Sequence, residues 1–362
     1  MRNEQMKMQK KSIMAMVVLV IFLSSCGVEE FNYVMSQTPG QILLLFNRVS
    51  IKRALKNKDL DPEVRKKLER ALDIKEYSEK DLGLVHNNSY TVYRKLDRDA
   101  LSYNLTACPK LSLKPLRWKF PVVGEMPYLG FFKKEDADKK KAELVKQGYD
   151  VYVRWVSAYS MLGIVSDPLY TPMLKYSDAD LANTLIHELT HGTVWAKGYP
   201  EFNENLALFV GNQGSLNYCV SRYGKDSAEV KYALGSNEDD VLFQKYLAGL
   251  AKQLNDLYAR KDLSDQEKLK MREQVFADTK KDFKDNWIPK MKTDSYNRWP
   301  TLEINNATVA SRLVYFHDLS LYENVYVKNG SDLKKTVGFI KNVVDTQPGD
   351  PEKNLKAWLD KN

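Results

Sequence analysis

Two histidines spaced four residues apart are the side chains of this sequence best placed to bind a metal. His187 and His191 lie in the segment HELTH. On a helix, residues four apart lie one turn apart on the same face, so both imidazoles can reach one ion. Glu188 follows the first histidine, and in an HExxH motif this glutamate is the general base that acts on the attacking water. The spacing therefore indicates a zinc hydrolase.

A catalytic zinc ion needs a third protein ligand and one open coordination position. We expect Glu204 to be that ligand. The residues Gly198 and Pro200 predict a tight corner after the histidines, and a second helix that starts near Glu201 would bring Glu204 back toward the first. Glu201 is a rival ligand, but it lies close to the turn.

A buried helix with two core histidines is the alternative reading of the HExxH segment. A glutamate between the histidines argues against it, because an unpaired carboxylate is costly to bury. The segment NENLA also adds an NExxA motif with Asn203, Glu204 and Ala207. The local signals for the helix are an N-cap at Ser177, an acidic residue at Asp180 and an apolar stripe. The stripe consists of Leu181, Leu185, Ile186 and Leu189.

The combination of HExxH and NExxA resembles the gluzincin metallopeptidases, and the NExxA form resembles their aminopeptidase N-like members. A closer resemblance is to a bacterial family described as "putative aminopeptidases", which are carried as secreted lipoproteins. It rests on the tracts PYLGFF (Pro127–Phe132) and GYDVYVRWVSAYSMLGIVSDPL (Gly148–Leu169) as well. The resemblance runs from about Thr38 to Tyr223 and more loosely to about Tyr322. It implies a metallopeptidase more firmly than an aminopeptidase.

The resemblance also implies a fold and further catalytic groups. We expect an α+β protein with a zincin-like core, in which a mixed sheet accompanies the active-site helix, and with helical additions at both ends. Gluzincins stabilise the oxyanion with a downstream Tyr or His, and Tyr315 and His317 are the candidates here. At most one of them can stabilise the oxyanion, because residues two apart on a helix point in very different directions. The ExxxD extension of gluzincins is absent, because position 208 is Leu.

The first 25 residues have the features of a lipoprotein signal peptide. A basic start precedes an apolar run from Ile13 to Leu23, which is too short to span a bilayer comfortably. The run ends in the lipobox LSSC, so Cys26 is the expected lipidated residue. This predicts a protein of the bacterial cell envelope, held at the membrane on the periplasmic or outer-membrane side. A transmembrane anchor followed by a free cysteine is the alternative.

Composition and charge indicate a globular protein that does not bind nucleic acid. A chain of 362 residues that is 43% hydrophobic can bury one large core or two moderate cores. The formal charge is +8, and the leader holds four basic residues and one acidic residue, which leaves +5. This excess is too small to indicate a nucleic-acid-binding protein. In an oxidising compartment Cys108 and Cys219 could form a disulfide, or both could be buried thiols.

Hydrophobic periodicity divides the chain beyond the leader into four regions. Residues 26–89 are expected to form a tether and two helices, over 41–57 and from Pro62, with Asp61 as the cap. Residues 90–225 are the catalytic core: strands in 89–96, 100–107 and 124–132, a helix over 135–148, then a strand with one covered face. Within 152–163 we expect an edge strand that pairs with extended substrate. Residues 226–292 are expected to form a helical hairpin, and residues 293–362 a helical region that completes the site.

We interpret the sequence as that of a lipid-anchored zinc metallopeptidase that acts on a peptide substrate, with an aminopeptidase as the favoured activity. Glu188 serves as base and then as proton donor to the leaving amine. One alternative is a zinc-containing lipoprotein that binds peptides without hydrolysing them, although zinc binding alone requires no base. The other is a zinc amidohydrolase that acts on cell-wall or other non-peptide amides.

Overall fold

The computed structural model describes residues 33, 48–98, 100–120, 124–156, 166–313 and 318–361. The protein is α+β, with small sheets and many helices. It divides into two compact units. Unit 1 consists of residues 1–46, 102–155 and 304–311, and unit 2 of residues 47–101, 156–303 and 312–362.

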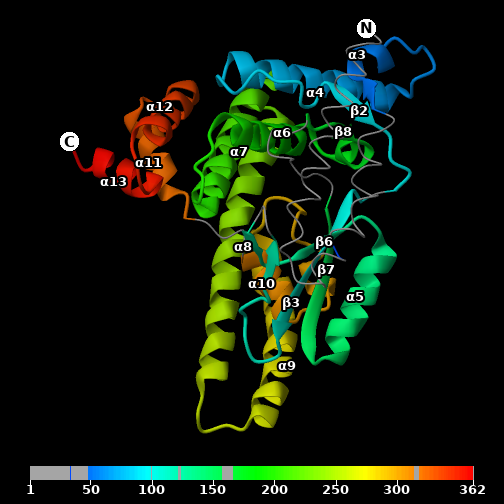
Figure 1. Ribbon diagram of the computed structural model, residues 1–362, viewed down its shortest axis with the longest axis vertical. Helices are drawn as coiled ribbons and strands as arrows, with labels where there is room; N and C mark the ends of the chain where they lie inside the picture. The colour runs from blue at the N-terminus through cyan, green and yellow to red at the C-terminus, as the bar shows by residue number, and fades with distance from the viewer. Residues whose placement is uncertain are drawn as a thin grey trace. The chain divides into compact units, whose positions relative to one another are not determined.

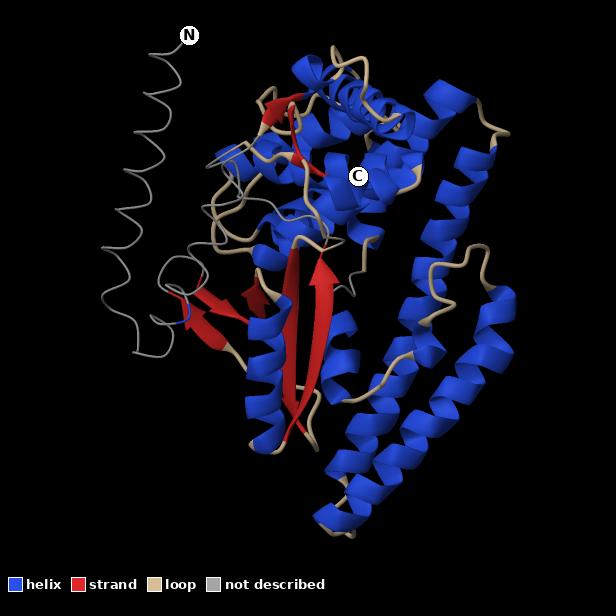
Figure 2. Ribbon diagram, turned by 90° about the vertical axis from the view of Figure 1, so that its right-hand side faces the viewer, coloured by secondary structure: helices blue, strands red, loops and turns tan. Residues whose placement is uncertain are grey.

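Unit 1 is built on a three-stranded sheet with the order β6-β3-β7. Strands β3 and β6 are antiparallel, with Leu105 opposite Leu129. Figure 2 shows the long strands with helix α5 beside them. The elements of unit 1 are β3 (Ser102–Pro109), β4 (Trp118–Phe120), β5 (Gly124–Met126), β6 (Leu129–Phe131), α5 (Lys134–Lys146), β7 (Tyr149–Val156) and α10 (Asn306–Leu313). The strand expected in 100–107 and the helix expected over 135–148 are thereby confirmed, and the strand expected after that helix is confirmed in its described part as β7. The run 124–132 forms two strands, β5 and β6, which belong to different sheets.

Both faces of the sheet in unit 1 carry buried side chains, so the expectation of one covered face is wrong. Successive residues of a strand point to opposite faces. Val151 joins a core cluster with Leu105 and with Leu144 of α5. Tyr152 instead packs on a second cluster that contains Cys108 and two alanines of α10. Helices therefore cover the sheet on either side.

Unit 2 contains a second small sheet with the order β1-β2-β8. Strand β2 is antiparallel to β1 and parallel to β8, with Tyr93 opposite both Val49 and Leu169. The elements are β1 (Val49–Ser50), β2 (Val92–Arg94) and β8 (Leu169–Tyr170). The 3-10 helix η2 (Thr171–Lys175) leads from β8 directly into the helix that carries the histidines. The last strand of this sheet is thus followed in the chain, after one short turn, by the helix that contains His187 and His191.

Three helices of unit 2 pack together, and α6 carries the histidines: α4 (Pro62–Lys80), α6 (Asp178–Thr193) and α7 (Pro200–Tyr223) (Figure 1). Each begins at a signal visible in the sequence. Asp61 caps α4 by accepting from the backbone N–H groups of Glu63 and Val64, and Pro62 is its first residue. Ser177 caps α6 by accepting from the N–H of Asp180. The predicted starts of α4 and α6 are confirmed.

The remaining helices of unit 2 follow in two groups. The hairpin consists of α8 (Ala228–Ala259) and α9 (Asp265–Asp282), with a capping box at Ser264. Its turn lies between Ala259 and Asp265, and both helices lie within the region 226–292 where a hairpin was expected. After the short turns η3 (Phe283–Trp287), η4 (Ile288–Lys290) and η5 (Trp299–Thr301) come α11 (Ser320–Lys328), α12 (Leu333–Thr346) and α13 (Pro351–Leu359). None of the helices within the described ranges combines the length and the apolarity needed to cross a bilayer.

The helix expected over 41–57 is wrong in its described part. Val49 and Ser50 form strand β1, and only Ile51–Ala54 is helical, as α3. The cause is long-range pairing, because β1 satisfies its backbone groups on β2. The first part of the expected helix lies outside the described residues, as do Cys26, the signal peptide and most of the expected edge strand. Cys108 and Cys219 are both buried free thiols.

Candidate metal centre

Helix α6 presents His187 and His191 on one face. Its opposite face is anchored in the core by an apolar stripe in which no residue is more than 1% exposed. That stripe consists of Leu181, Leu185, Ile186 and Leu189. The Nε2 atoms of the two histidines are 3.2 Å apart, and the rings are nearly perpendicular, at 87°. The helical spacing therefore points both nitrogens at one position.

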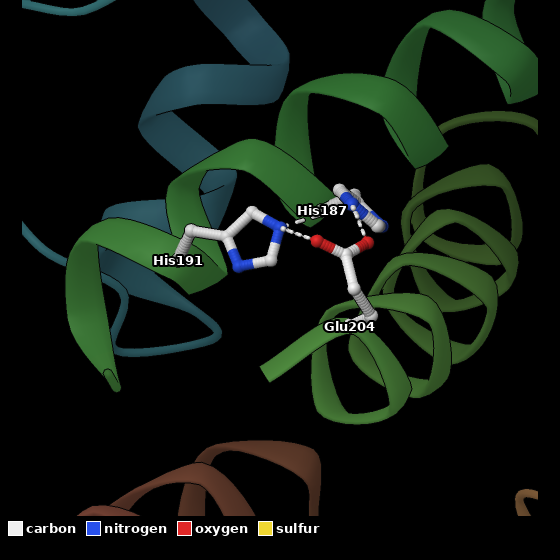
Figure 3. Close-up of side chains that lie close together, drawn as sticks. All are labelled: His187, His191 and Glu204. Atoms are coloured by element: carbon white, nitrogen blue, oxygen red, sulfur yellow. Dashed lines mark hydrogen bonds and ion pairs between the residues drawn. The ribbon is translucent and has the colours of Figure 1, made fainter. Parts of the chain in front are cut away.

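Glu204 on α7 completes the cluster, as Figure 3 shows. One carboxylate oxygen lies 3.5 Å from Nε2 of His191, and the other lies 3.7 Å from Nε2 of His187. Two ligand atoms bound about 2.1 Å from a tetrahedral zinc ion lie about 3.4 Å apart. The separations among the three groups are close to that value. Within the described ranges, this is the one group of three or more His, Cys, Asp or Glu side chains that could hold a metal ion.

The charge state of the cluster also suits a cation. Burial lowers the pKa of His187 to about 3, helped by the neighbouring imidazole, and burial lowers the pKa of His191 to about 4. Both rings are therefore neutral near pH 7 and offer lone pairs. Burial raises the pKa of Glu204 from its ordinary value, although 47% of its side-chain surface is exposed. A nearby positive charge would counter that cost.

Two glycines of α7 allow it to approach α6 closely. A Cβ atom at Gly211 would lie 3.2 Å from the carbonyl oxygen of Asn183, and one at Gly214 would lie 3.0 Å from Ile186. These contacts are tighter than side chains normally make. The two helices can therefore pack near enough for the carboxylate of Glu204 to reach the imidazoles.

The same approach orients the first imidazole. The ring of His187 donates a hydrogen bond to the backbone carbonyl of Ala207 on α7. A ligating histidine usually donates its second N–H in this way, which fixes its tautomer and direction. Here the acceptor is a backbone carbonyl, one residue before Leu208. Within the described residues, Nδ1 of His191 has no hydrogen-bond partner.

Asn203 holds the loop between the two helices. Its side-chain oxygen accepts from the N–H of Ala196 at 2.8 Å, and its amide nitrogen donates to the carbonyl of Ala196 at 2.9 Å. Asn203 is only 2% exposed. The motif NExxA thus supplies a loop clamp at Asn203 beside the ligand candidate Glu204. The motif was recognised in the sequence, but the role of Asn203 in holding the loop was not predicted.

Glu188 lies on α6 directly after His187 and is partly exposed. Its charge helps to raise the pKa of Tyr90, a fully buried phenol whose burial is the main cause of the shift. Tyr90 has a left-handed backbone, with φ of 60°. Its N–H donates to the carbonyl of Asp167 at 2.6 Å. Tyr90 fell within the strand expected over 89–96, which begins only at Val92, and no motif marked it as part of the site.

The remaining predicted site residues are Tyr315, His317 and Glu201. Tyr315 and His317 lie outside the described residues. Glu201 is exposed at the start of α7 and is not among the clustered side chains. Glu204 therefore has the better geometry of the two candidate third ligands.

A buried network joins the start of α7 to the C-terminal helices. Tyr322 of α11 donates to Glu352 of α13 at 3.1 Å, and the amide of Asn205 donates to the same carboxylate oxygen at 3.1 Å. Tyr322 is 1% exposed and also stacks on Phe209. The network anchors the residue that directly follows Glu204.

Comparison with known proteins gives one family. The chain matches the model of the family described as "Putative aminopeptidase" over residues 32–355. No curated protein and no solved structure gives a significant match.

Proposed function

The chain belongs to the family described as "Putative aminopeptidase", and we propose that it is a zinc-dependent peptidase that removes N-terminal residues from peptides. The observation that carries the zinc assignment is the convergence of two neutral imidazoles and one carboxylate. Their donor atoms are 3.2 to 3.7 Å apart. That spacing and that donor set suit a tetrahedral zinc site with one open position.

His187, His191 and Glu204 would hold the metal. When bound, zinc supplies a Lewis acid that polarises the scissile carbonyl and lowers the pKa of a water molecule. Glu188 accepts a proton from the attacking water at a carboxylate oxygen. It then donates that proton to the nitrogen of the leaving amine as the C–N bond breaks. The backbone of Ala207 keeps the His187 ring turned toward the cluster throughout.

Further parts of the proposal concern the surroundings of the site. We assign α6, α7 and the sheet that precedes α6 to a zincin-like core of the gluzincin type. Tyr315 or His317 stabilises the oxyanion. Lipidation of Cys26 holds the protein at the membrane of the bacterial cell envelope, where peptides reach it.

The test compares the full chain with Glu188→Gln. Zinc content is measured by elemental analysis, and hydrolysis is followed on aminoacyl amides and on internally quenched peptides. We expect about one zinc ion per chain in both proteins and a loss of at least about 100-fold in kcat for the variant, as removal of a general base requires. Chelation should abolish the activity of the parent.

Glu201→Gln is the matched control, since it makes the same change at an exposed position of the neighbouring helix. It should keep both zinc and activity. Full activity of Glu188→Gln, or a parent chain that binds no zinc, would refute the proposal. Cleavage of quenched internal peptides alone would replace the aminopeptidase assignment with an endopeptidase.

A further inference from the structure

Trp195 is a large aromatic residue beside the metal-ligand candidates whose side chain stays open to solvent. It is 45% exposed, and its ring centroid lies 5.7 Å from that of His191, with the planes at 73°. The side chain of His191 is only 5% exposed. The indole therefore covers one side of the imidazole and still offers apolar surface at the rim of the cluster.

The loop that carries Trp195 is held rigidly. Asn203 makes two hydrogen bonds to Ala196, the next residue along the chain. The N–H of Tyr199 closes a turn onto the carbonyl of Ala196 at 3.2 Å. Gly198 takes a φ of 88° within this turn, a conformation that favours glycine. Polar contacts thus hold the backbone directly after Trp195, and the ring of His191 contacts the indole.

An exposed indole on a hydrogen-bonded loop is well suited to binding. It offers a large apolar area, and little conformational entropy is lost when a ligand packs against it. If Trp195 served only to shield His191, contact through one part of the indole ring would suffice. A smaller side chain could then take its place. The exposed part is therefore available to whatever occupies the site.

We propose that Trp195 forms a wall of a substrate subsite that accepts a large apolar side chain, aliphatic or aromatic, next to the scissile bond. This inference rests on the proposed function, because it takes the ligand to be a peptide held at the cluster. Nε2 of His191, whose ring Trp195 contacts, faces Glu204 within the cluster (Figure 3). A neighbouring side chain of the peptide can then lie against the indole.

The test measures peptide binding without turnover. Full chains that carry Glu188→Gln and are loaded with zinc are titrated calorimetrically with two dipeptide series, in which either the first or the second residue is Gly, Ala, Leu or Phe. Trp195→Ala and Trp195→Phe are compared with the parent in this background. In one series, we expect Trp195→Ala to weaken Leu and Phe peptides about tenfold and Gly and Ala peptides less than about threefold. Trp195→Phe should restore most of the preference.

Lys197→Ala is the control, because it alters an exposed residue of the same loop and leaves the indole intact. It should bind all peptides as the parent does. An equal loss for all peptides, or weaker zinc binding by Trp195→Ala, would show that Trp195 only supports His191 and would overturn the inference. Unchanged binding in both series would overturn it as well. If Trp195→Ala selectively weakens binding of Leu and Phe peptides, but the chain with Glu188 intact hydrolyses no peptide, the subsite is retained and the proposed peptidase function is refuted.

Discussion

Gly211 of α7 faces His187 of α6 so closely that a Cβ atom at position 211 would lie 3.3 Å from the Cβ atom of the histidine. The same Cβ atom would also lie 3.1 Å from the side-chain oxygen of Asn183. The contact brings the backbone of α7 within reach of the imidazole, which donates to the carbonyl of Ala207. The absence of a side chain at one position thus sets both the helix separation and the direction of a ligand candidate.

Gly211→Ala should push the helices apart. Overpacking of this kind lowers the free energy of unfolding by about 1 to 3 kcal/mol, and we expect zinc affinity to fall about tenfold because Glu204 is carried away from the histidines. Urea denaturation and competition with a chelator measure the two effects. Gly249→Ala on α8 is the control, since no atom lies within 4 Å of its added Cβ. That change should stabilise the protein by about 0.5 to 1 kcal/mol; unaltered zinc affinity in Gly211→Ala would contradict the role of the close approach.

Asn203→Ala should free the loop between α6 and α7. The change removes two buried hydrogen bonds to Ala196, each worth about 1 kcal/mol, so local opening should become about ten to a hundred times more frequent. Lys197 is exposed in this loop and provides a cleavage site. Limited trypsin digestion should therefore cut after Lys197 faster in the variant. Equal cleavage rates in variant and parent would show that Asn203 does not restrain the loop.

Acid should weaken the start of α6 through Asp178. Burial alone would raise the pKa of this carboxyl, but hydrogen bonds from Lys67 and Tyr223 outweigh it and lower the pKa below its ordinary value of 3.8. A depressed pKa means that the stabilisation is complete well above pH 4 and is lost as the pH falls through the folded-state value. Asp178→Asn should thus be less stable than the parent at pH 7, and the difference should shrink toward pH 3.

Urea denaturation at pH 7 and pH 3 measures this difference. Asp256→Asn serves as the control, since the Asp256 side chain is 65% exposed in its pair with Lys252. Its effect should be small at both values. A constant gap between Asp178→Asn and the parent would rule out the ionised carboxylate as the cause.

Tyr322→Phe should destabilise the contact between the C-terminal helices and α7. The hydroxyl of the buried Tyr322 donates to the partly exposed carboxylate of Glu352, and a bond to a charged group contributes about 1.5 to 3 kcal/mol. The ring and its stacking on Phe209 remain, so the loss should come from the hydroxyl alone. Urea denaturation measures it, and Tyr326→Phe on the same helix is the comparison. A similar loss of unfolding free energy in both variants would show that the hydrogen bond to Glu352 is not the cause.

Local signals in the sequence predicted the helices that carry the site. The caps at Asp61 and Ser177, and Pro200 as the first residue of α7, act within a few residues of the helix starts. The spacing of the HExxH motif placed two imidazoles on one face for the same reason. The grouping of Glu204 with them could be expected, because the corner at Gly198 and Pro200 turns the chain back.

Other features depend on contacts between distant residues and were missed. Strand β1 forms where a helix was expected, since its partner lies on β2. The glycines Gly211 and Gly214 could have been noticed, because glycine is unfavourable inside a helix unless close packing requires it. No comparable signal marked Tyr90, whose relation to Glu188 arises only from the fold.

The bond between Asn205 and Glu352 joins residues that are 147 positions apart. While the polypeptide is being synthesised or exported, the histidine-bearing segment emerges long before the segment that will hold the following helix in place. The proposed zinc site should therefore assemble late, after the last helices have docked. Proteolytic removal of α13 should therefore weaken the proposed zinc site, although α13 contains none of the candidate ligands.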